Sequence, residues 1–175
     1  EEILITFERV INTCKSENVH LLLIAGDLFD FNSVKEEYVT TVQQLLAGIP
    51  DTIVGISAGN HDNASGGSPY LKDGWSENVH IFHGELVSVP FDEKGFRLVG
   101  AGFSSTYQDT PLLKEFSFPK DDLISIGVLH GEISSSAEEG VYNPISIHQI
   151  AQSGLDYLAL GHQHKATQIL KSGET

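Results

Sequence analysis

Four short apolar runs in this chain each lead into polar residues that can bind a metal ion. The runs cover residues 21–25, 53–58, 124–129 and 157–160. Runs of this kind are typical of strands that are buried on both faces. Helical periodicity covers residues 2–17, before the first of these runs, and residues 34–47, between the first two, and a short helix is expected at 146–153. The alternation of strands and helices predicts an α/β layered domain with a largely parallel central sheet. Further strands are expected at residues 78–82, 85–89, 96–102 and 166–171.

The composition excludes several classes of protein. A chain of 175 residues, 40% of them hydrophobic, suits one folded domain. No apolar run approaches the roughly 20 residues that cross a bilayer, so no membrane association is expected. Because 24 acidic residues outnumber 10 basic ones, the formal net charge is −14, which disfavours tight non-specific binding of nucleic acid and suits divalent cations. The one cysteine, Cys14, excludes an intramolecular disulfide and fits a reducing, cytoplasmic location.

The polar residues after the strands are the types that hold two metal ions. They are Asp27 after the first run, Asn60 and His61 after the second, His130 after the third, and His162 and His164 after the fourth. In α/β sheets ligands collect at the carboxyl ends of strands, so these residues can converge although they lie far apart in sequence. Imidazoles suit Mn, Fe, Zn or Ni, and a carboxylate can bridge two ions.

Each of these residues also has an ordinary structural interpretation. An aspartate after a strand is commonly a turn residue, and a single buried histidine is commonly hydrogen-bonded within a core. The coincidence at four strand ends favours the metal site.

A competing motif, Gly55-Ile56-Ser57-Ala58-Gly59, fits the G-x-S-x-G pattern of serine hydrolases. That motif requires a helix directly after the strand, whereas a Gly/Ser-rich loop follows here. Trp75 and Tyr70 could stack on a base, but packing within the loop is the favoured interpretation.

The ordered set of motifs resembles the calcineurin-type metallophosphoesterase superfamily. The chain reads G-D-L-F-D at 26–30, G-N-H-D at 59–62, H-G at 130–131 and G-H-Q-H at 161–164. Within the superfamily, residues 22–30, 77–82 and 156–162 resemble the SbcD-like DNA repair exonucleases. The stretch at 141–146 is similar to a branch of uncharacterised exonuclease-like proteins.

The resemblance implies roles for the motif residues. Asp27 would bridge two divalent ions, with Mn expected and Fe, Zn or Ni left open. Asn60, His130 and His162 would complete the shell of one ion, and His164 would bind the other. His61 would not bind metal; it would protonate or orient the leaving oxygen while the ions activate a water. Asp62 is expected to hold the ring of His61.

One motif of the family, D-x-H, is not found. It is expected at the end of a strand before the first helix, where the chain begins. The chain also has no Met, so residues 1–175 are expected to be a metallophosphoesterase (nuclease) domain that is incomplete at both ends, lacking a central strand and two ligands.

The expected function is metal-dependent hydrolysis of phosphodiesters, as a DNA exonuclease of the SbcD-like type. The resemblance implies DNA as substrate, an SbcC-like ATPase partner and a homodimer. Three alternatives stay open: a small-molecule phosphodiesterase or phosphatase of the same superfamily, a non-catalytic scaffold with this fold, and a serine hydrolase.

Overall fold

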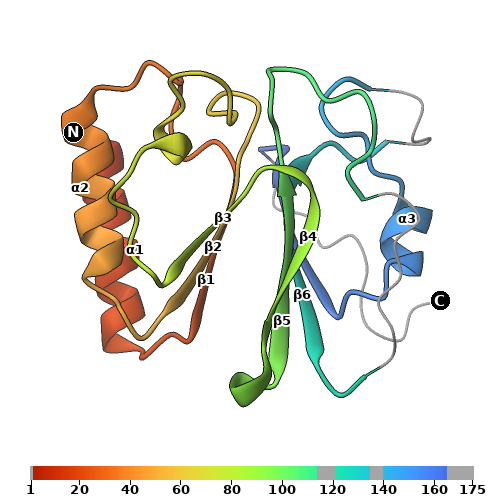
Figure 1. Cartoon of the computed structure of the whole chain (residues 1–175), viewed down its shortest axis with the longest axis horizontal. Helices are drawn as coiled ribbons and strands as arrows, with labels where there is room; N and C mark the ends of the chain where they lie inside the picture. Colours follow the sequence, from red (N-terminus) through yellow and green to blue (C-terminus); the bar gives the residue numbers. More distant parts are fainter. Residues whose placement is uncertain (1, 114–120, 135–139, 165–175) are drawn as a thin grey trace.

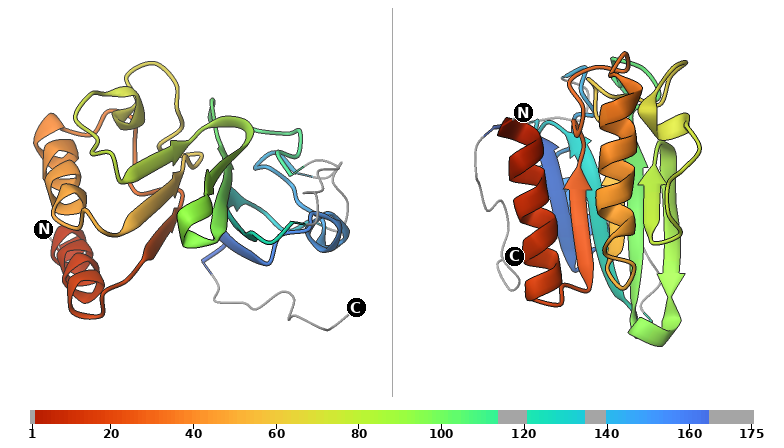
Figure 2. Two further views of the ribbon diagram at one scale, coloured as in Figure 1. Left: turned by 60° about the horizontal axis from the view of Figure 1, so that its bottom comes forward. Right: turned by 90° about the vertical axis from the view of Figure 1, so that its left-hand side faces the viewer.

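Two helices form the outer layer on one side of the protein. A computed structural model describes residues 2–113, 121–134 and 140–164. Helices α1 (Glu2–Ser16) and α2 (Glu36–Ala47) lie side by side over the first sheet (Figures 1 and 2). The buried residues of α1 are Ile11 and Cys14, which confirms that the cysteine lies on the apolar face.

The first sheet has three parallel strands in the order β1-β2-β3. They are β1 (Leu21–Ala25), β2 (Ile53–Ser57) and β3 (Val79–Phe82). Side chains of β1 alternate between the two faces, as the pleat requires. Leu22 and Ile24 pack toward the helices, whereas Leu21, Leu23 and Ala25 pack toward the second sheet.

The second sheet has four strands in the order β4-β5-β6-β7. They are β4 (Gly84–Phe91), β5 (Phe96–Gly102), β6 (Ile124–Gly131) and β7 (Tyr157–His162). Strands β5, β6 and β7 are parallel, and β4 runs antiparallel to β5. The two antiparallel strands are joined by a short turn, η2 (Asp92–Lys94), that ends at Gly95 with φ 74°. A connection this short can join only antiparallel neighbours.

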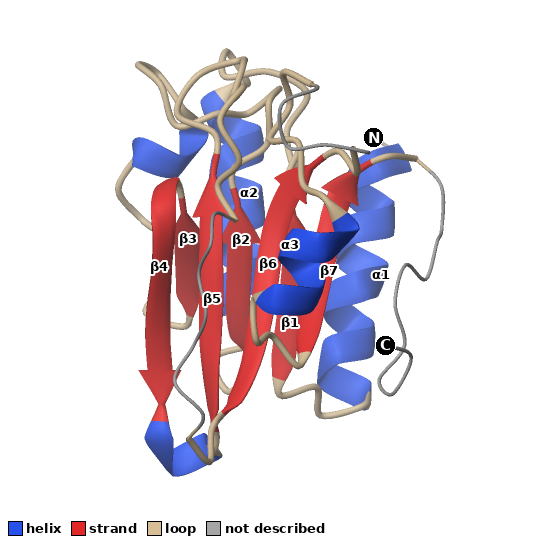
Figure 3. Cartoon of the chain, turned by 90° about the vertical axis from the view of Figure 1, so that its right-hand side faces the viewer, coloured by secondary structure: helices blue, strands red, loops and turns tan. Residues whose placement is uncertain are grey.

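The expectation of one largely parallel sheet is therefore wrong, because the strands divide into two sheets packed face to face. The predicted class, α/β with central sheets flanked by helices, is confirmed. Ile53, Phe82, Phe96, Leu98 and Val128 form the apolar layer between the sheets. Helix α3 (Ile147–Gln152) covers the outer face of the second sheet (Figure 3). A capping box between Ser146 and Gln149 begins this helix.

The first strand differs from its prediction in burial. Both faces of β1 are packed, yet all five of its residues remain partly exposed. Within the described part of the chain, β1 pairs only with β2, so its other edge is open. The strand predicted at 166–171 lies outside the described residues. Among the described helices, none is both long enough and apolar enough to cross a membrane.

Candidate metal centre

Side chains from four strand ends meet at one edge of the two sheets. β1 is followed by Asp27 and β2 by Asn60, while His130 is the penultimate residue of β6 and His162 the last residue of β7. The loops of both sheets gather at this edge (Figure 3). Ligand atoms of Asp27, His130 and His162 all lie within 4.8 Å of one another. The structure thus brings together four of the five predicted metal ligands.

His130 is the buried centre of this cluster, with 1% of its surface exposed. Its Nδ1 lies 2.8 Å from the carbonyl oxygen of Ala25, so we assign the ring proton to Nδ1, where it is donated to that oxygen. Nε2 then presents a lone pair. It faces Asn60 Oδ1 at 3.0 Å, Asp27 Oδ2 at 3.3 Å and His162 Nδ1 at 3.3 Å. Fixing the tautomer through the other ring nitrogen is how proteins prepare a histidine to bind metal.

The cluster has the donor set of a cation site. Asp27 Oδ2 and Asn60 Oδ1 can only accept hydrogen bonds, and Asn60 Oδ1 lies a further 3.2 Å from His162 Nδ1. Ligands bound about 2.1 Å from one ion at right angles stand about 3 Å apart, which matches these separations. A divalent cation would satisfy the converging lone pairs together, so the residues fit the metal that the motifs imply.

Two of these residues have strained backbones. Asp27 has φ 52° and His162 has φ 96°, both in the left-handed region that non-glycine residues rarely adopt. Such conformations cost on the order of 1–3 kcal/mol each and cluster at functional sites. Here the strain aims both side chains into the cluster.

The charges of the cluster are coupled. Burial by itself would raise the pKa of the Asp27 carboxyl, but a protonated His130 ring and the His61 backbone N–H lower that pKa below its usual value. Burial lowers the pKa of His162, and the neighbouring His130 adds to the shift. Both shifts favour the deprotonated forms that bind metal.

Glycines give the side chains room to approach one another. A Cβ on Gly26, which has φ 86°, would lie 2.2 Å from His130 Nδ1. A Cβ on Gly59 would lie 2.1 Å from Asp27 Oδ1. No larger residue fits at either position without moving a ligand.

Asp62 has a different role from the one expected. The prediction that it holds the ring of His61 is wrong. Its fully buried carboxylate accepts hydrogen bonds from the backbone N–H groups of Gly59, Phe29 and Asp27, at 2.8, 3.0 and 3.2 Å. Burial raises its pKa, although hydrogen bonds from Tyr70 and the backbone oppose the shift. Asp62 therefore ties the loop that carries Asp27 to the loop that carries Asn60.

His61 is exposed at the edge of the cluster. Its backbone N–H donates to Asp27 Oδ1 at 3.1 Å, and its Nδ1 lies 3.3 Å from the carbonyl oxygen of Asp30. The ring therefore stands beside the centre without contributing to it. His164 is also exposed and does not join the cluster of ligand atoms.

Asn143 is a supporting residue that the sequence analysis missed. It is fully buried with φ 51°. Its Nδ2 donates to the carbonyl oxygen of His130 at 2.8 Å, and its Oδ1 accepts from the Leu112 N–H at 2.7 Å. The only signal was an Asn before Pro144, which is typical of a turn.

The competing motifs have structural roles. Ser57 is fully buried and donates to the carbonyl oxygen of Ala101 at 2.6 Å, and no α-helix directly follows β2. This geometry is not that of a nucleophile elbow. Trp75 donates from Nε1 to the Pro69 carbonyl at 3.2 Å and contacts the buried ring of Tyr70, which agrees with loop packing.

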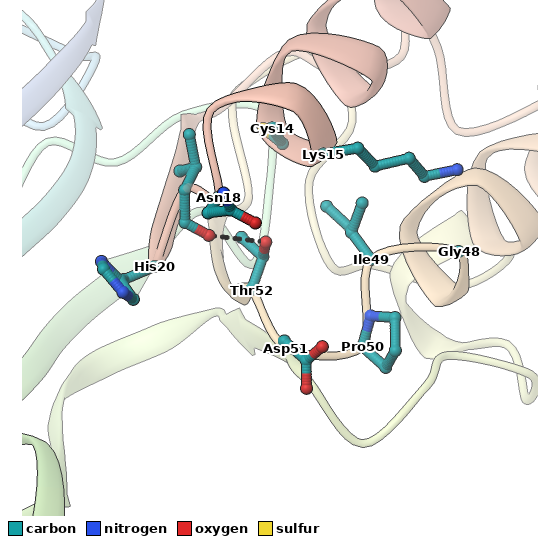
Figure 4. Close-up of a pocket in the computed structure, with 10 residues that line it drawn as sticks. Cys14, Lys15, Asn18, His20, Gly48, Ile49, Pro50, Asp51 and Thr52 are labelled. Carbon is teal, nitrogen blue, oxygen red and sulfur yellow. Dashed lines mark hydrogen bonds between the residues drawn. The ribbon is translucent and has the colours of Figure 1, made fainter.

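A separate cavity of about 290 Å³ lies at the opposite end of β1 and β2 (Figure 4). Cys14, Asn18 and Pro50 are among its lining residues, and a hydrogen bond from Thr52 Oγ1 to the Val19 carbonyl crosses it. None of the motif residues lines this cavity.

The α/β fold and the converging ligand atoms together define a protein with a candidate divalent-metal centre at the ends of its strands. Residues 2–166 match the family described as calcineurin-like phosphoesterase, so the chain belongs to that family. It is also similar to a Bacillus subtilis (strain 168) protein named uncharacterized metallophosphoesterase YhaO, with 33% identity over 173 residues. That similarity covers 93% of this chain and 41% of the relative, so the chain spans less than half of the relative's length. Membership of the family indicates metal-dependent hydrolysis of phosphoesters.

Proposed function

We propose that residues 1–175 form the nuclease domain of an SbcD-like DNA exonuclease that hydrolyses phosphodiesters. The observation that carries the proposal is the group of ligand atoms from Asp27, Asn60 and His162 gathered around His130 Nε2. The exposed ring of His61 lies beside this group. A metal-binding cluster next to an exposed imidazole supplies both an electrophile and a proton donor for phosphoryl chemistry.

The metal ligands proposed are Asp27, Asn60, His130, His162 and His164. When bound, two divalent ions, with Mn expected, would offset the phosphate charge as Lewis acids and lower the pKa of a water, so that hydroxide becomes available to attack phosphorus. The described chain holds two of these ligands in place, because the ring of His130 and the backbone of Asp27 are fixed by hydrogen bonds.

His61 is proposed to protonate or orient the leaving oxygen. The hydrogen bond from its backbone to Asp27 fixes its distance from the centre, while its ring stays accessible to substrate. Proton transfer by a positioned histidine contributes about 10²–10⁴-fold to rate. No nucleophilic side chain is required for this reaction.

A second candidate is a small-molecule phosphodiesterase or phosphatase of the same family. The net charge of −14 favours it, because a strongly acidic chain attracts DNA poorly. The nuclease is favoured by three segments whose sequences resemble those of the SbcD-like group, at residues 22–30, 77–82 and 156–162. The two candidates share one metal centre and differ in substrate.

The test is hydrolysis by the full-length protein of bis-p-nitrophenyl phosphate and of end-labelled DNA, with Mn²⁺ or with EDTA. We expect Mn-dependent cleavage of both, lost with EDTA.

His61→Ala should retain metal and lose about 10²-fold or more in turnover, whereas Asp27→Ala should lose metal. His148→Ala, an exposed histidine on α3, is the matched control. Cleavage of the small diester alone would favour the second candidate, and bound metal without any cleavage would favour a scaffold.

A further inference from the structure

An exposed tyrosine stands close to the metal centre. Tyr107 is 62% exposed, and its ring centroid lies 5.8 Å from that of Tyr142. The ring of Tyr142 in turn lies 5.0 Å from the ring of His162. A line of three rings therefore leads from solvent to a metal ligand. The outer ring of this line is open to solvent, so a flat group could pack on it beside the ligands.

The segments that carry these tyrosines are held in register with each other. The N–H of Gln108 donates to the Val141 carbonyl at 2.8 Å, and the N–H of Asn143 donates to the Gln108 carbonyl at 2.6 Å. Glu132 Oε1 accepts hydrogen bonds from the N–H groups of Val141 and Tyr142, at 3.0 and 3.1 Å. The backbone on both sides of the ring pair is thus fixed.

The same frame is tied to the metal centre. Asn143 donates to the carbonyl oxygen of His130, and Glu132 follows His130 by two residues at the end of β6. The ring pair therefore keeps a constant position relative to the ligands. A surface that is already ordered binds a flat group without the cost of ordering itself.

The position of Tyr107 indicates which part of a substrate it meets. His61, assigned to the leaving oxygen, is bonded to Asp27 on one side of the cluster. Tyr142 contacts a different ligand, His162, and Tyr107 lies beyond Tyr142. A phosphodiester whose leaving group faces His61 would direct its retained group toward Tyr107.

We propose that Tyr107, backed by Tyr142, is a stacking subsite for the base of the nucleoside that keeps the phosphate after cleavage. The inference rests on the proposed function and names a specificity-determining residue for it. Stacking on an aromatic ring does not depend on charge, so this subsite lets a chain with a net charge of −14 hold a nucleotide substrate. Tyr107 acts on binding and not on the chemical step.

The experiment compares diesters that share one leaving group. The full-length protein with Mn²⁺ is assayed on the 5′- and 3′-p-nitrophenyl phosphates of thymidine and on methyl p-nitrophenyl phosphate, which has no base. We expect Tyr107→Leu to raise KM for the better thymidine ester by about fivefold to a hundredfold, the range for one stacked base, with kcat unchanged. Tyr107→Phe should restore the wild-type KM, and KM for the methyl ester should not change.

Tyr157→Leu is the matched control, because Tyr157 is 59% exposed and lies at the far end of the strand that ends in His162. It should behave as wild type on all three esters. An equal change in KM for thymidine and methyl esters, or no change in either, would overturn the stacking subsite while hydrolysis itself stands. Failure to cleave any of the three esters would overturn the proposed function, and the subsite with it.

Discussion

Asp62 illustrates how one buried carboxylate organises the loops of the centre. Its Oδ2 accepts a short hydrogen bond of 2.5 Å from the hydroxyl of Tyr70, besides the bonds from the backbone. Burial raises the pKa of Tyr70 well above its usual value, and the negative charge of Asp62 adds to the shift. The hydroxyl therefore stays protonated in the folded protein at a pH where an unfolded tyrosine ionises.

This shift predicts an alkaline loss of stability that depends on Tyr70. Below pH 10 the tyrosine is protonated in both states, so its hydrogen bond stabilises the fold in full. Above that pH only the unfolded chain releases the proton, so the contribution of Tyr70 to the free energy of unfolding falls by about 1.4 kcal/mol per pH unit. Tyr70→Phe should be less stable than wild type by about 1–3 kcal/mol at pH 8, because Asp62 loses a donor.

The measurement is the free energy of unfolding in urea between pH 8 and pH 11. The gap between wild type and Tyr70→Phe should narrow as the pH rises above 10. A gap that stays constant over the whole range would show that Tyr70 titrates normally in the folded protein.

At the scale of elements, the centre depends on how closely the two sheets approach at one edge. A Cβ on Gly161 would lie 1.9 Å from the carbonyl oxygen of Ala25, so β7 and β1 meet with only hydrogen atoms between their backbones. The same carbonyl accepts the Nδ1–H of His130. Any separation of these strands would therefore disturb the tautomer of His130 as well as the packing.

Gly161→Ala should destabilise the protein and weaken the metal centre together. Overpacking lowers the free energy of unfolding by about 1–3 kcal/mol. We expect a loss near the upper end of that range, because the clash is with rigid backbone. The measurement is urea unfolding with and without Mn²⁺, with Gly66→Ala as control because a Cβ there meets nothing within 4 Å. Equal stability of the two variants would mean that β1 and β7 are not packed as described.

Most elements could be predicted from the sequence because their patterns are local. The helical periodicity of residues 2–17 and the apolar run at 96–102 correspond closely to α1 and β5. Division into two sheets could not be predicted, since it depends on which strands pair, and pairing leaves no local pattern in strands buried on both faces. The partial exposure of β1 has the same origin, because a run of apolar residues does not show whether its strand lies at the edge of a sheet.

At the scale of the whole molecule, the sequence predicted the residues of the centre that follow or end a strand. It did not predict the residues that support them. Asp27, Asn60, His130 and His162 share one edge because parallel strands end together. The roles of Asp62 and Asn143 depend on contacts between distant loops, which spacing along the chain does not encode. The meeting of these four residues was thus predicted, while the hydrogen bonds that hold them were not.

The central claim is that these strand ends hold a divalent ion, and metal content tests it most directly. The full-length protein and its His130→Ala and His148→Ala variants are dialysed against Mn²⁺, washed, and analysed for bound metal per folded chain, with circular dichroism to confirm folding. Wild type and His148→Ala should retain the ion, and His130→Ala should lose most of it, because the ligand atoms of the other residues converge on His130 Nε2. A folded His130→Ala variant with the metal content of wild type would contradict the assignment.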